Sequence, residues 1–339
     1  MKNEQYLVGT VTTAMYYGHL SDMSSLYMYK NALWVTDENT SRFVPDFADR
    51  RLEIPSGEEN KNIDSITKII DEAIRLEFGR DDVIVGLGGG VICDMAGFAA
   101  SIYMRGCRAV LIPSTLLAMN DASLGGKTGI DYTGYKNLLG AFYPAEEIYV
   151  FSDIVNTLTE RDYLSGLSEV IKHAFLSGKD FFNFINDNRE GILNRNTEIL
   201  DVLIPWSLSV KGHIVEKDAK EHGIRAYLNL GHTFGHALET LSGFSIKHGE
   251  CVAWGIAKAM KAGVMLNITD PDYAEGVISV LKSFGYVLEY GGYSSEDLKK
   301  MMIMDKKKRG GRIRFVVQER IGKTLLTEIP DDILLSVLS

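Results

Sequence analysis

The first half of the chain alternates short apolar runs with a longer stretch in which apolar residues recur at helical spacing. Runs of four or five apolar and β-branched residues are typical of buried strands, whereas helical spacing is typical of an amphipathic helix. Such alternation predicts a parallel sheet covered by helices. The strand-like runs are 32–36, 83–86, 109–113 and 148–151, and the helix-like stretch is 63–78.

From about residue 160 onward the pattern changes to long helical periods, at 166–176, 198–217, 232–241, 248–266 and 271–284. Pro205 lies inside one of these periods, which predicts that this helix starts or is kinked there. Two strand-like segments, 312–317 and 323–326, flank Ile321 and Gly322 and predict a small hairpin. We therefore predict two domains, an α/β domain with a parallel sheet over residues 1–160 and a mostly α-helical domain over residues 161–339.

Composition narrows the possible partners and compartment. The 339 residues carry a net charge of −9 and are 45% hydrophobic, which fits a globular protein and disfavours nucleic acid as a partner. Cys93, Cys107 and Cys251 have no Cys-x-x-Cys spacing, so we expect no disulfide framework and a reducing, cytoplasmic compartment. The N-terminus is polar and no apolar run approaches the roughly 20 residues that span a bilayer, so we expect no membrane partner.

Histidines cluster in one part of the second domain. His232 and His236 are four residues apart, so on a helix they share a face, and His248 follows after one short loop. Glu169 lies upstream in an apolar helical stretch. Neutral imidazoles and a carboxylate suit Zn²⁺, and three protein ligands with an open fourth position is the arrangement of catalytic sites. The other reading, that these histidines are core or capping residues, is weakened by the flanking glycines.

A glycine-rich segment, 86–90, stands where a predicted strand feeds a helix. Glycines let the backbone approach a pyrophosphate, with the N–H groups of the helix N-terminus pointing at it. Asp37 follows the first predicted strand, where an acidic side chain would receive ribose hydroxyls. A second segment, 121–128, nearly matches a P-loop, but Asp121 replaces the first glycine and no strand precedes it. We expect a nucleotide at the first segment and a phosphate contact from Lys127 at the second.

The chain resembles a known family, the dehydroquinate synthases within the sugar-phosphate cyclases. The resemblance runs from Glu58 to about Lys323 and rests on motifs in a fixed order, at 88–94, 104–106, 113–118, 125–129, 136–142, 166–172, 231–236, 248–250 and 305–307. It implies a redox-neutral conversion of a seven-carbon keto-acid sugar phosphate, 3-deoxy-arabino-heptulosonate 7-phosphate, into cyclic 3-dehydroquinate. The implied cofactors are NAD⁺ and a divalent metal, Zn²⁺ or Co²⁺. The implied assembly is a homodimer in which Arg105 serves the neighbouring subunit's site.

The resemblance also implies residue roles. By this resemblance, the metal ligands are Glu169, His232 and His248. The residues with catalytic roles are Glu221, His236, Lys172 and Asp121. Substrate contacts fall on Arg105, Lys127, Asn137, Lys211, Arg225, Asn229 and Lys306, the last being one candidate among lysines 306–308. Cofactor contacts fall on Asp37, Glu58, Lys61, Gly89, Gly90, Val91, Asp94, Ser114, Thr115 and Lys136.

Other readings remain open on the sequence alone. A different sugar-phosphate cyclase, making an inosose or a valiolone, would share most motifs. A metal-dependent polyol dehydrogenase would share the glycine turn and the helical metal domain, but would have no need of so many anion-binding residues. A catalytically silent binding protein would have no reason to keep metal ligands, bases and cations together. The chain departs from the family pattern at Ser114, Asn120 and Asp131.

Overall fold

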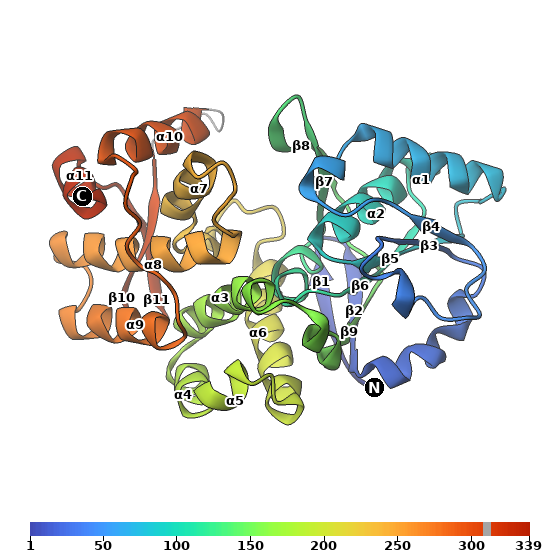
Figure 1. Ribbon diagram of the computed structural model, residues 1–339, viewed down its shortest axis with the longest axis horizontal. Helices are drawn as coiled ribbons and strands as arrows, with labels where there is room; N and C mark the ends of the chain where they lie inside the picture. Colours follow the sequence, from blue (N-terminus) through green and yellow to red (C-terminus); the bar gives the residue numbers. More distant parts are fainter. Residues whose placement is uncertain (308–312) are drawn as a thin grey trace. The chain divides into compact units, whose positions relative to one another are not determined.

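Figure 1 shows the computed structural model of the chain, which describes residues 1–307 and 313–339, with the side chains of 305–307 outside that description. The chain divides into two compact units, Met1–Leu158 with Leu200–Lys220, and Thr159–Ile199 with Glu221–Ser339. Residues 200–220 therefore belong with the first unit, although the sequence analysis placed them in the second domain. Local contacts give the reason: a Cβ at Gly212 would meet the Tyr6 ring at 2.2 Å, and Glu216 accepts a hydrogen bond from Leu7 N at 3.0 Å.

The first unit is built on a seven-stranded sheet in the order β1-β2-β9-β6-β5-β3-β4. All neighbouring strands are parallel except β1 and β2, which are antiparallel. The predicted α/β class with a parallel sheet is thus confirmed. The strands are β1 (Lys2–Val8), β2 (Val11–Gly18), β3 (Leu33–Thr36), β4 (Arg51–Glu53), β5 (Val83–Gly88), β6 (Arg108–Pro113) and β9 (Glu147–Phe151), with β7 (Lys127–Tyr132) and β8 (Tyr135–Phe142) forming a separate antiparallel hairpin.

Helix α2 (Gly90–Ile102) packs closely on β5, beside α1 (Ile63–Arg75). Glycines make this approach possible, because a Cβ at Gly88 would lie 2.6 Å from Ile92 Cβ and one at Gly86 would lie 2.7 Å from Ala96 Cβ. A π-helical turn, Ala118–Ala122, follows β6, and short 3₁₀ helices cover Leu20–Tyr29, Ser41–Phe43, Glu58–Asn60, Tyr103–Arg105 and Ser152–Thr157. The glycine-rich segment is therefore a strand-to-helix turn, as the sequence predicts.

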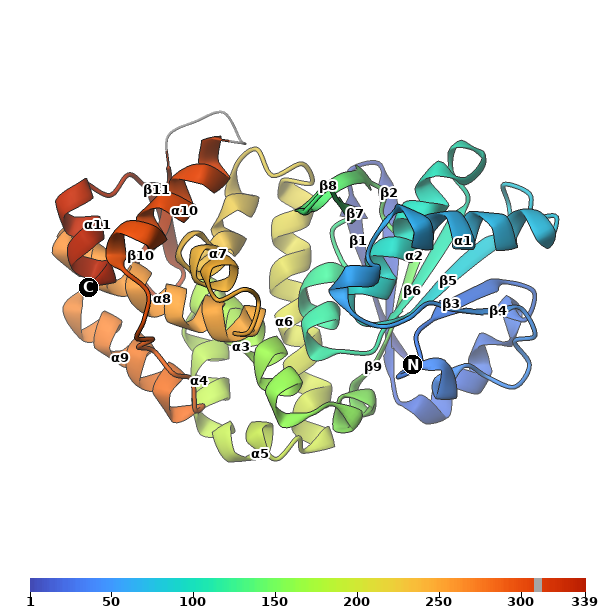
Figure 2. The ribbon, with the colours of Figure 1, turned by 45° about the horizontal axis from the view of Figure 1, so that its top comes forward.

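The second unit is mostly helical, with α8 packed against α3, α7, α9 and β10 (Figure 2). Its helices are α3 (Glu160–Ser177), α4 (Lys179–Asp187), α5 (Arg189–Leu193), α7 (His232–Leu241), α8 (His248–Met265), α9 (Pro271–Ser283), α10 (Ser295–Lys307) and α11 (Asp331–Leu338), with a 3₁₀ helix at Ile224–Asn229. The predicted hairpin is present as β10 (Phe315–Arg320) and β11 (Lys323–Thr327). The chain passes between the units in α6 (Thr197–Lys217), which continues through the buried Pro205 and so does not start there.

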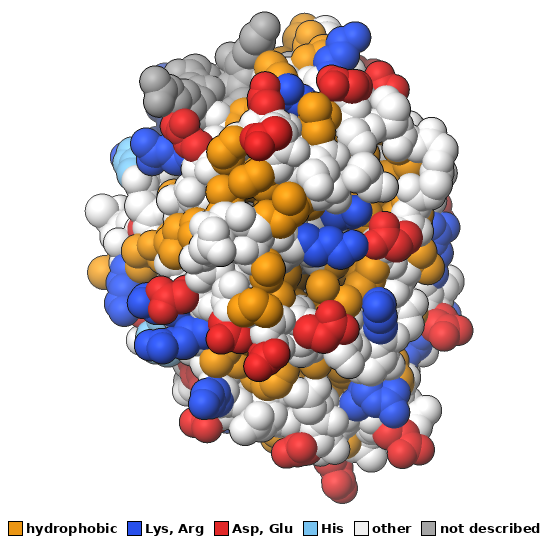
Figure 3. All heavy atoms as spheres, turned by 90° about the vertical axis from the view of Figure 1, so that its left-hand side faces the viewer, with side chains coloured by type: hydrophobic (Ala, Val, Ile, Leu, Met, Phe, Trp, Pro, Cys, Tyr) orange, Lys and Arg blue, Asp and Glu red, His pale blue; other side chains and the backbone are white. Residues whose placement is uncertain are grey.

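Three properties of the helices, the surface and the core bear on the class of protein. No helix in the described part of the chain is long and apolar enough to cross a membrane. Acidic and basic side chains are interspersed with apolar ones on the face in Figure 3, instead of forming a continuous basic surface there. Cys93, Cys107 and Cys251 are buried and form no disulfide.

Candidate functional site

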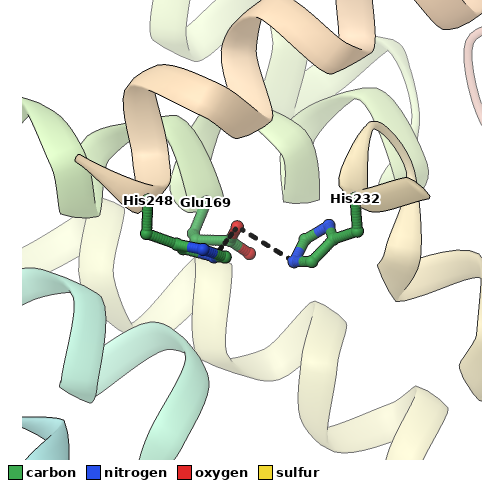
Figure 4. A group of neighbouring side chains, drawn as sticks. All are labelled: Glu169, His232 and His248. Carbon is green, nitrogen blue, oxygen red and sulfur yellow. Dashed lines mark ion pairs between the residues drawn. The ribbon is translucent and has the colours of Figure 1, made fainter. Parts of the chain in front are cut away.

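Helices α3, α7 and α8 of the second unit bring Glu169, His232 and His248 together (Figure 4). The carboxylate oxygen Oε1 of Glu169 lies 3.6 Å from His232 Nε2 and 3.8 Å from His248 Nε2. This oxygen is buried and has no hydrogen-bond partner among the described residues. A buried carboxylate oxygen without a donor is costly, and the three residues form a group that could hold a metal ion.

The distances suit a transition metal. Ligands of Zn²⁺ lie about 2.0–2.2 Å from the ion, which in a tetrahedron places them about 3.4 Å from one another. The observed 3.6 and 3.8 Å separations are a few tenths of an ångström longer, so a modest inward shift would complete the site. His232 Nδ1 faces the carbonyl oxygen of Leu230 at 3.3 Å, which leaves its Nε2 as the ligand atom.

Glycines explain why these helices come close enough. A Cβ at Gly249 would lie 1.9 Å from the carbonyl oxygen of Ser165, so α8 contacts α3 backbone to backbone. A Cβ at Gly255 would lie 2.0 Å from the carbonyl oxygen of Gly231, and Gly231 itself has φ +82°, which a side chain disfavours. The flanking glycines noted in the sequence are therefore the contacts that seat the ligand-bearing helices.

Two of the predicted catalytic residues, Lys172 and His236, adjoin these three side chains. Lys172, one turn from Glu169 on α3, pairs with the other oxygen of that carboxylate, and both side chains are buried. His236 lies one turn from His232 on α7, with ring centroids 5.2 Å apart, and 5.8 Å from the His248 ring. In the same unit Asn229 donates a 2.6 Å hydrogen bond to Glu221, and Arg225 is buried on the 3₁₀ helix between them.

A contact with Glu239 was not anticipated from the sequence. Glu239 Oε2 lies 3.2 Å from His248 Nδ1, and Glu239, His236 and His248 form a second group of neighbouring ligand atoms. The available signal was spacing, because Glu239 is three residues after His236 and so lies on the same face of α7.

The N-terminus of α8, where His248 lies, is fixed by Glu250. This carboxylate accepts from Lys247 N at 2.8 Å and from both Arg161 Nε at 3.0 Å and Nη2 at 2.7 Å. Partial burial tends to raise the pKa of Glu250, but these hydrogen bonds outweigh burial and lower it. The Glu250 contribution to stability is therefore present above the ordinary carboxyl pKa and is lost as pH falls through the lowered value.

Glu250→Gln is expected to lower the free energy of unfolding at pH 7 by about 0.5–1 kcal/mol, a small effect because Arg161 is half exposed. The difference from the wild type should shrink as pH falls below the ordinary value of 4.5. Chemical denaturation at pH 7 and pH 4 measures both. An equal difference at the two pH values would mean that the charge of Glu250 is not the stabilising feature.

The first unit presents a nucleotide-type edge. From β3 the chain adds β4 on one side, and from β5 it adds β6 and then β9 on the other side. The order in which strands are added therefore reverses between β3 and β5. Ligands of such sheets bind beyond the carboxyl ends of the strands at this reversal. Asp37 directly follows β3, and Gly89 and Gly90 directly follow β5 and open α2. Ser114 and Thr115 follow β6 in the same way, and Val91 lies in the first turn of α2.

Several predicted cofactor residues contact one another in this unit. Lys61 is buried and pairs with Asp94 at 2.6 Å. Burial raises the pKa of the Asp94 carboxyl to about 6, although the charge of Lys61 and its hydrogen bond oppose this rise. Burial alone would lower the pKa of Lys61, but the carboxylates of Asp94 and Glu58 raise it. Lys136 Nζ lies 3.6 Å from Glu58 Oε1.

Two predicted residues have local partners that the sequence did not suggest. Asn137, assigned to substrate, accepts a 2.6 Å hydrogen bond from Lys61. Asp37 Oδ1 accepts hydrogen bonds from Asn39 N, Thr40 N and Thr40 Oγ1, at 3.0, 3.0 and 2.8 Å, and so also shapes its own loop.

The π-helical turn carries Asp121, and α6 brings Lys211 to it. Lys211 Nζ lies 2.7 Å from Asp121 Oδ1 and also contacts the Asp121 carbonyl oxygen. Lys127 starts β7, and Arg105 has φ +65° at the end of a 3₁₀ helix. The side chain of Lys306, and all of Lys308, lie outside the described residues.

The fold of this chain is similar to the folds of several solved structures. A crystal structure of 2-deoxy-scyllo-inosose synthase with carbaglucose-6-phosphate, NAD⁺ and Co²⁺ matches with a TM-score of 0.90 and 22% identity, over 99% of each chain. Another, of 2-epi-5-epi-valiolone synthase from Streptomyces hygroscopicus with NAD⁺ and Zn²⁺, matches with a TM-score of 0.88 and 20% identity, over 100% of this chain and 97% of that chain. An iron-containing alcohol dehydrogenase matches less well, with a TM-score of 0.65 and 18% identity over 99% of this chain and 98% of that chain. The fold is that of the sugar-phosphate cyclases.

Sequence comparison is more specific. The family model described as 3-dehydroquinate synthase N-terminal matches residues 51–165, and the one described as 3-dehydroquinate synthase C-terminal matches residues 166–308. The 3-dehydroquinate synthase of Acetivibrio thermocellus is 38% identical over 88% of this chain and 86% of its own length. That of Dictyoglomus thermophilum is 42% identical over 81% of this chain and 78% of its own length. The chain belongs to the 3-dehydroquinate synthase family.

Proposed function

We propose that this chain is a 3-dehydroquinate synthase, a phosphate-eliminating carbon–oxygen lyase of the shikimate pathway of aromatic amino acid biosynthesis. The observation that carries the proposal is the identity of 38% over 88% of the chain to a relative of that name. The cyclases with other products are only 20–22% identical. The substrate would be 3-deoxy-arabino-heptulosonate 7-phosphate, and the products 3-dehydroquinate and inorganic phosphate.

The second unit would hold the metal on Glu169, His232 and His248. The buried oxygen of Glu169 without a donor supports this assignment, and imidazole nitrogens with one carboxylate suit Zn²⁺ or Co²⁺. When bound, such an ion supplies a Lewis acid that polarises the hydroxyl to be oxidised. Lys172, paired with Glu169, would fix the orientation of the carboxylate and point its remaining donors at substrate.

The first unit would hold NAD⁺ at the β3–β5 edge, with its pyrophosphate at the N-terminus of α2 near Gly89, Gly90 and Val91. When bound, NAD⁺ would supply a reversible acceptor for the hydride on the carbon that bears the reacting hydroxyl. The proposed cofactor set also includes Asp37, Glu58, Lys61, Asp94, Ser114, Thr115 and Lys136. The Lys61–Asp94 pair would hold the loop before α1 against α2.

The substrate carries a carboxylate and a phosphate, and cationic and amide donors recognise such groups. We assign these contacts to Arg105, Lys127, Asn137, Lys211, Arg225, Asn229 and Lys306. Asp121 would orient Lys211, with which it pairs. His236 and Glu221 would move protons at the reacting carbons and oxygens, His236 because it adjoins both imidazole ligands without belonging to the ligand set.

The proposed reaction is redox-neutral overall. Oxidation of one hydroxyl to a ketone acidifies the adjacent C–H, proton removal there expels phosphate, and the hydride then returns to the ketone. Ring opening and an aldol closure follow without further redox change. We place the enzyme in the cytoplasm, since its buried cysteines form no disulfide. The family resemblance supports a homodimer in which Arg105 reaches the neighbouring subunit's site.

Hydride return distinguishes this scheme from a polyol dehydrogenase. Purified enzyme given the heptulosonate phosphate and a catalytic amount of NAD⁺ should release many equivalents of phosphate per NAD⁺, with no build-up of absorbance from NADH. Phosphate assay and NADH absorbance in the same reaction measure this. NADH formed in proportion to substrate consumed would support a dehydrogenase instead.

A further inference from the structure

We propose that Glu239 is a positioning residue that sets His248 as a metal ligand by accepting the Nδ1 proton of its imidazole. The inference rests on the metal centre of the proposed function and concerns a residue outside its ligand set. It follows from the place of the His248 ring between two carboxylates. Nδ1 lies 3.2 Å from Glu239 Oε2, and Nε2 lies 3.8 Å from Glu169 Oε1.

The two contacts have different chemistry. A neutral imidazole carries one N–H and one lone pair, so a ring whose Nδ1 donates presents its lone pair at Nε2. The 3.2 Å separation at Glu239 is that of a hydrogen bond, whereas the longer separation at Glu169 leaves room for an ion between ligand atoms. Glu239 thus fixes both the tautomer and the plane of the His248 ring.

The two histidine ligands obtain this orientation in different ways. His232 directs Nδ1 at the backbone carbonyl of Leu230, a neutral acceptor, at 3.3 Å. His248 directs Nδ1 at a side-chain carboxylate, which polarises the imidazole more strongly and makes Nε2 the better donor. Removing Glu239 should therefore weaken one ligand selectively.

The support for Glu239 is itself rigid. Glu239 is only 9% exposed. Its backbone carbonyl oxygen accepts hydrogen bonds from Phe244 N at 3.0 Å and from Ser242 Oγ at 2.8 Å, at the end of α7. These bonds hold the backbone of Glu239, and a carboxylate that extends from a fixed helical backbone positions the imidazole better than one on a mobile loop would. His248 is in turn the first residue of α8, so one contact joins the end of α7 to the start of α8.

The test is metal affinity, measured on metal-free protein by Co²⁺ titration in the visible range and by Zn²⁺ competition against a chelator. Loss of an orienting partner typically lowers metal affinity by about 10–100-fold. We expect the loss of metal affinity in Glu239→Ala to lie near the upper end of this range. The loss in Glu239→Gln should lie near the lower end, because the amide oxygen still accepts the Nδ1 proton. Both Co²⁺ complexes should keep one ion per chain but show altered absorption bands. Glu275→Gln, the same change at an exposed position on α9, should match the wild type.

Circular dichroism melting of the metal-free variants separates folding from metal binding. Equal affinity and identical Co²⁺ spectra in wild type and Glu239→Gln and Glu239→Ala would overturn the proposal. So would complete loss of metal in Glu239→Gln with retention in Glu169→Gln, because that result makes Glu239 a ligand with His236 and His248. Failure of the wild type itself to bind Co²⁺ or Zn²⁺ would instead overturn the metal centre of the proposed function, and this inference with it.

Discussion

Replacing His232 or His248 with alanine is expected to leave the purified enzyme without stoichiometric metal and to lower turnover by more than about 100-fold. Loss of an orienting residue already costs about 10–100-fold in metal affinity, so loss of a direct ligand should cost more. The same holds for Glu169→Gln, because its Oε1 faces both imidazoles. Metal analysis and a phosphate-release assay on each variant measure the two effects.

His236→Ala is the matched control, since it removes an imidazole from the same helix face. It should retain metal and lose about 10²–10⁴-fold in rate, the usual contribution of an acid–base group. Stoichiometric metal in His232→Ala would remove His232 from the ligand set. Metal loss in His236→Ala would favour the second group, formed by His236, Glu239 and His248.

Gly249→Ala is expected to destabilise the second unit strongly. The added Cβ would lie 1.9 Å from the carbonyl oxygen of Ser165 and 2.5 Å from Ser168 Oγ, so α8 must move away from α3. Overpacking of this kind typically costs about 1–3 kcal/mol, and contact with backbone, which cannot rotate away, places it at the upper end. Because the same movement separates His248 from Glu169, metal affinity should fall as well.

Gly276→Ala on α9 supplies the comparison, since nothing lies within 4 Å of its added Cβ. Alanine there should stabilise the protein by about 0.5–1 kcal/mol, as expected for a helix interior. Chemical denaturation of both metal-free variants gives the difference directly. If Gly249→Ala were as stable as the wild type, the close α3–α8 approach would not be what seats the ligands.

Local sequence pattern predicted a cluster of candidate metal ligands because these residues lie in short motifs, whereas the choice of Glu169, His232 and His248 came from the family resemblance and stays a prediction. His232 and His236 share a helix face by spacing alone, and Glu169 stands out as an acid in an apolar helix. The parallel sheet could also be predicted from the sequence, because β3, β5, β6 and β9 are buried apolar runs bounded by turn residues. In both cases the information lies within a few residues of the feature.

Other features depend on contacts that no local pattern carries. In the sequence, Lys211 lies in the helical second half of the chain. In the structure, its Nζ contacts Asp121, and residues 200–220 belong with the first unit. Glu239 reads as an ordinary helix charge until α8 places His248 Nδ1 beside it. Asn137 was assigned by resemblance to substrate, whereas its observed side-chain partner is Lys61. These three contacts join residues that are brought together only by the tertiary fold.

Identification of the reaction product distinguishes a 3-dehydroquinate synthase from the other sugar-phosphate cyclases. Purified enzyme loaded with Zn²⁺ or Co²⁺ would be incubated with catalytic NAD⁺ and either 3-deoxy-arabino-heptulosonate 7-phosphate or glucose 6-phosphate, which lacks a carboxylate, and the products identified by mass spectrometry and NMR. The account predicts 3-dehydroquinate and one equivalent of phosphate from the first substrate and no cyclic product from the second. A cyclic product from glucose 6-phosphate, with the heptulosonate phosphate left unchanged, would contradict it.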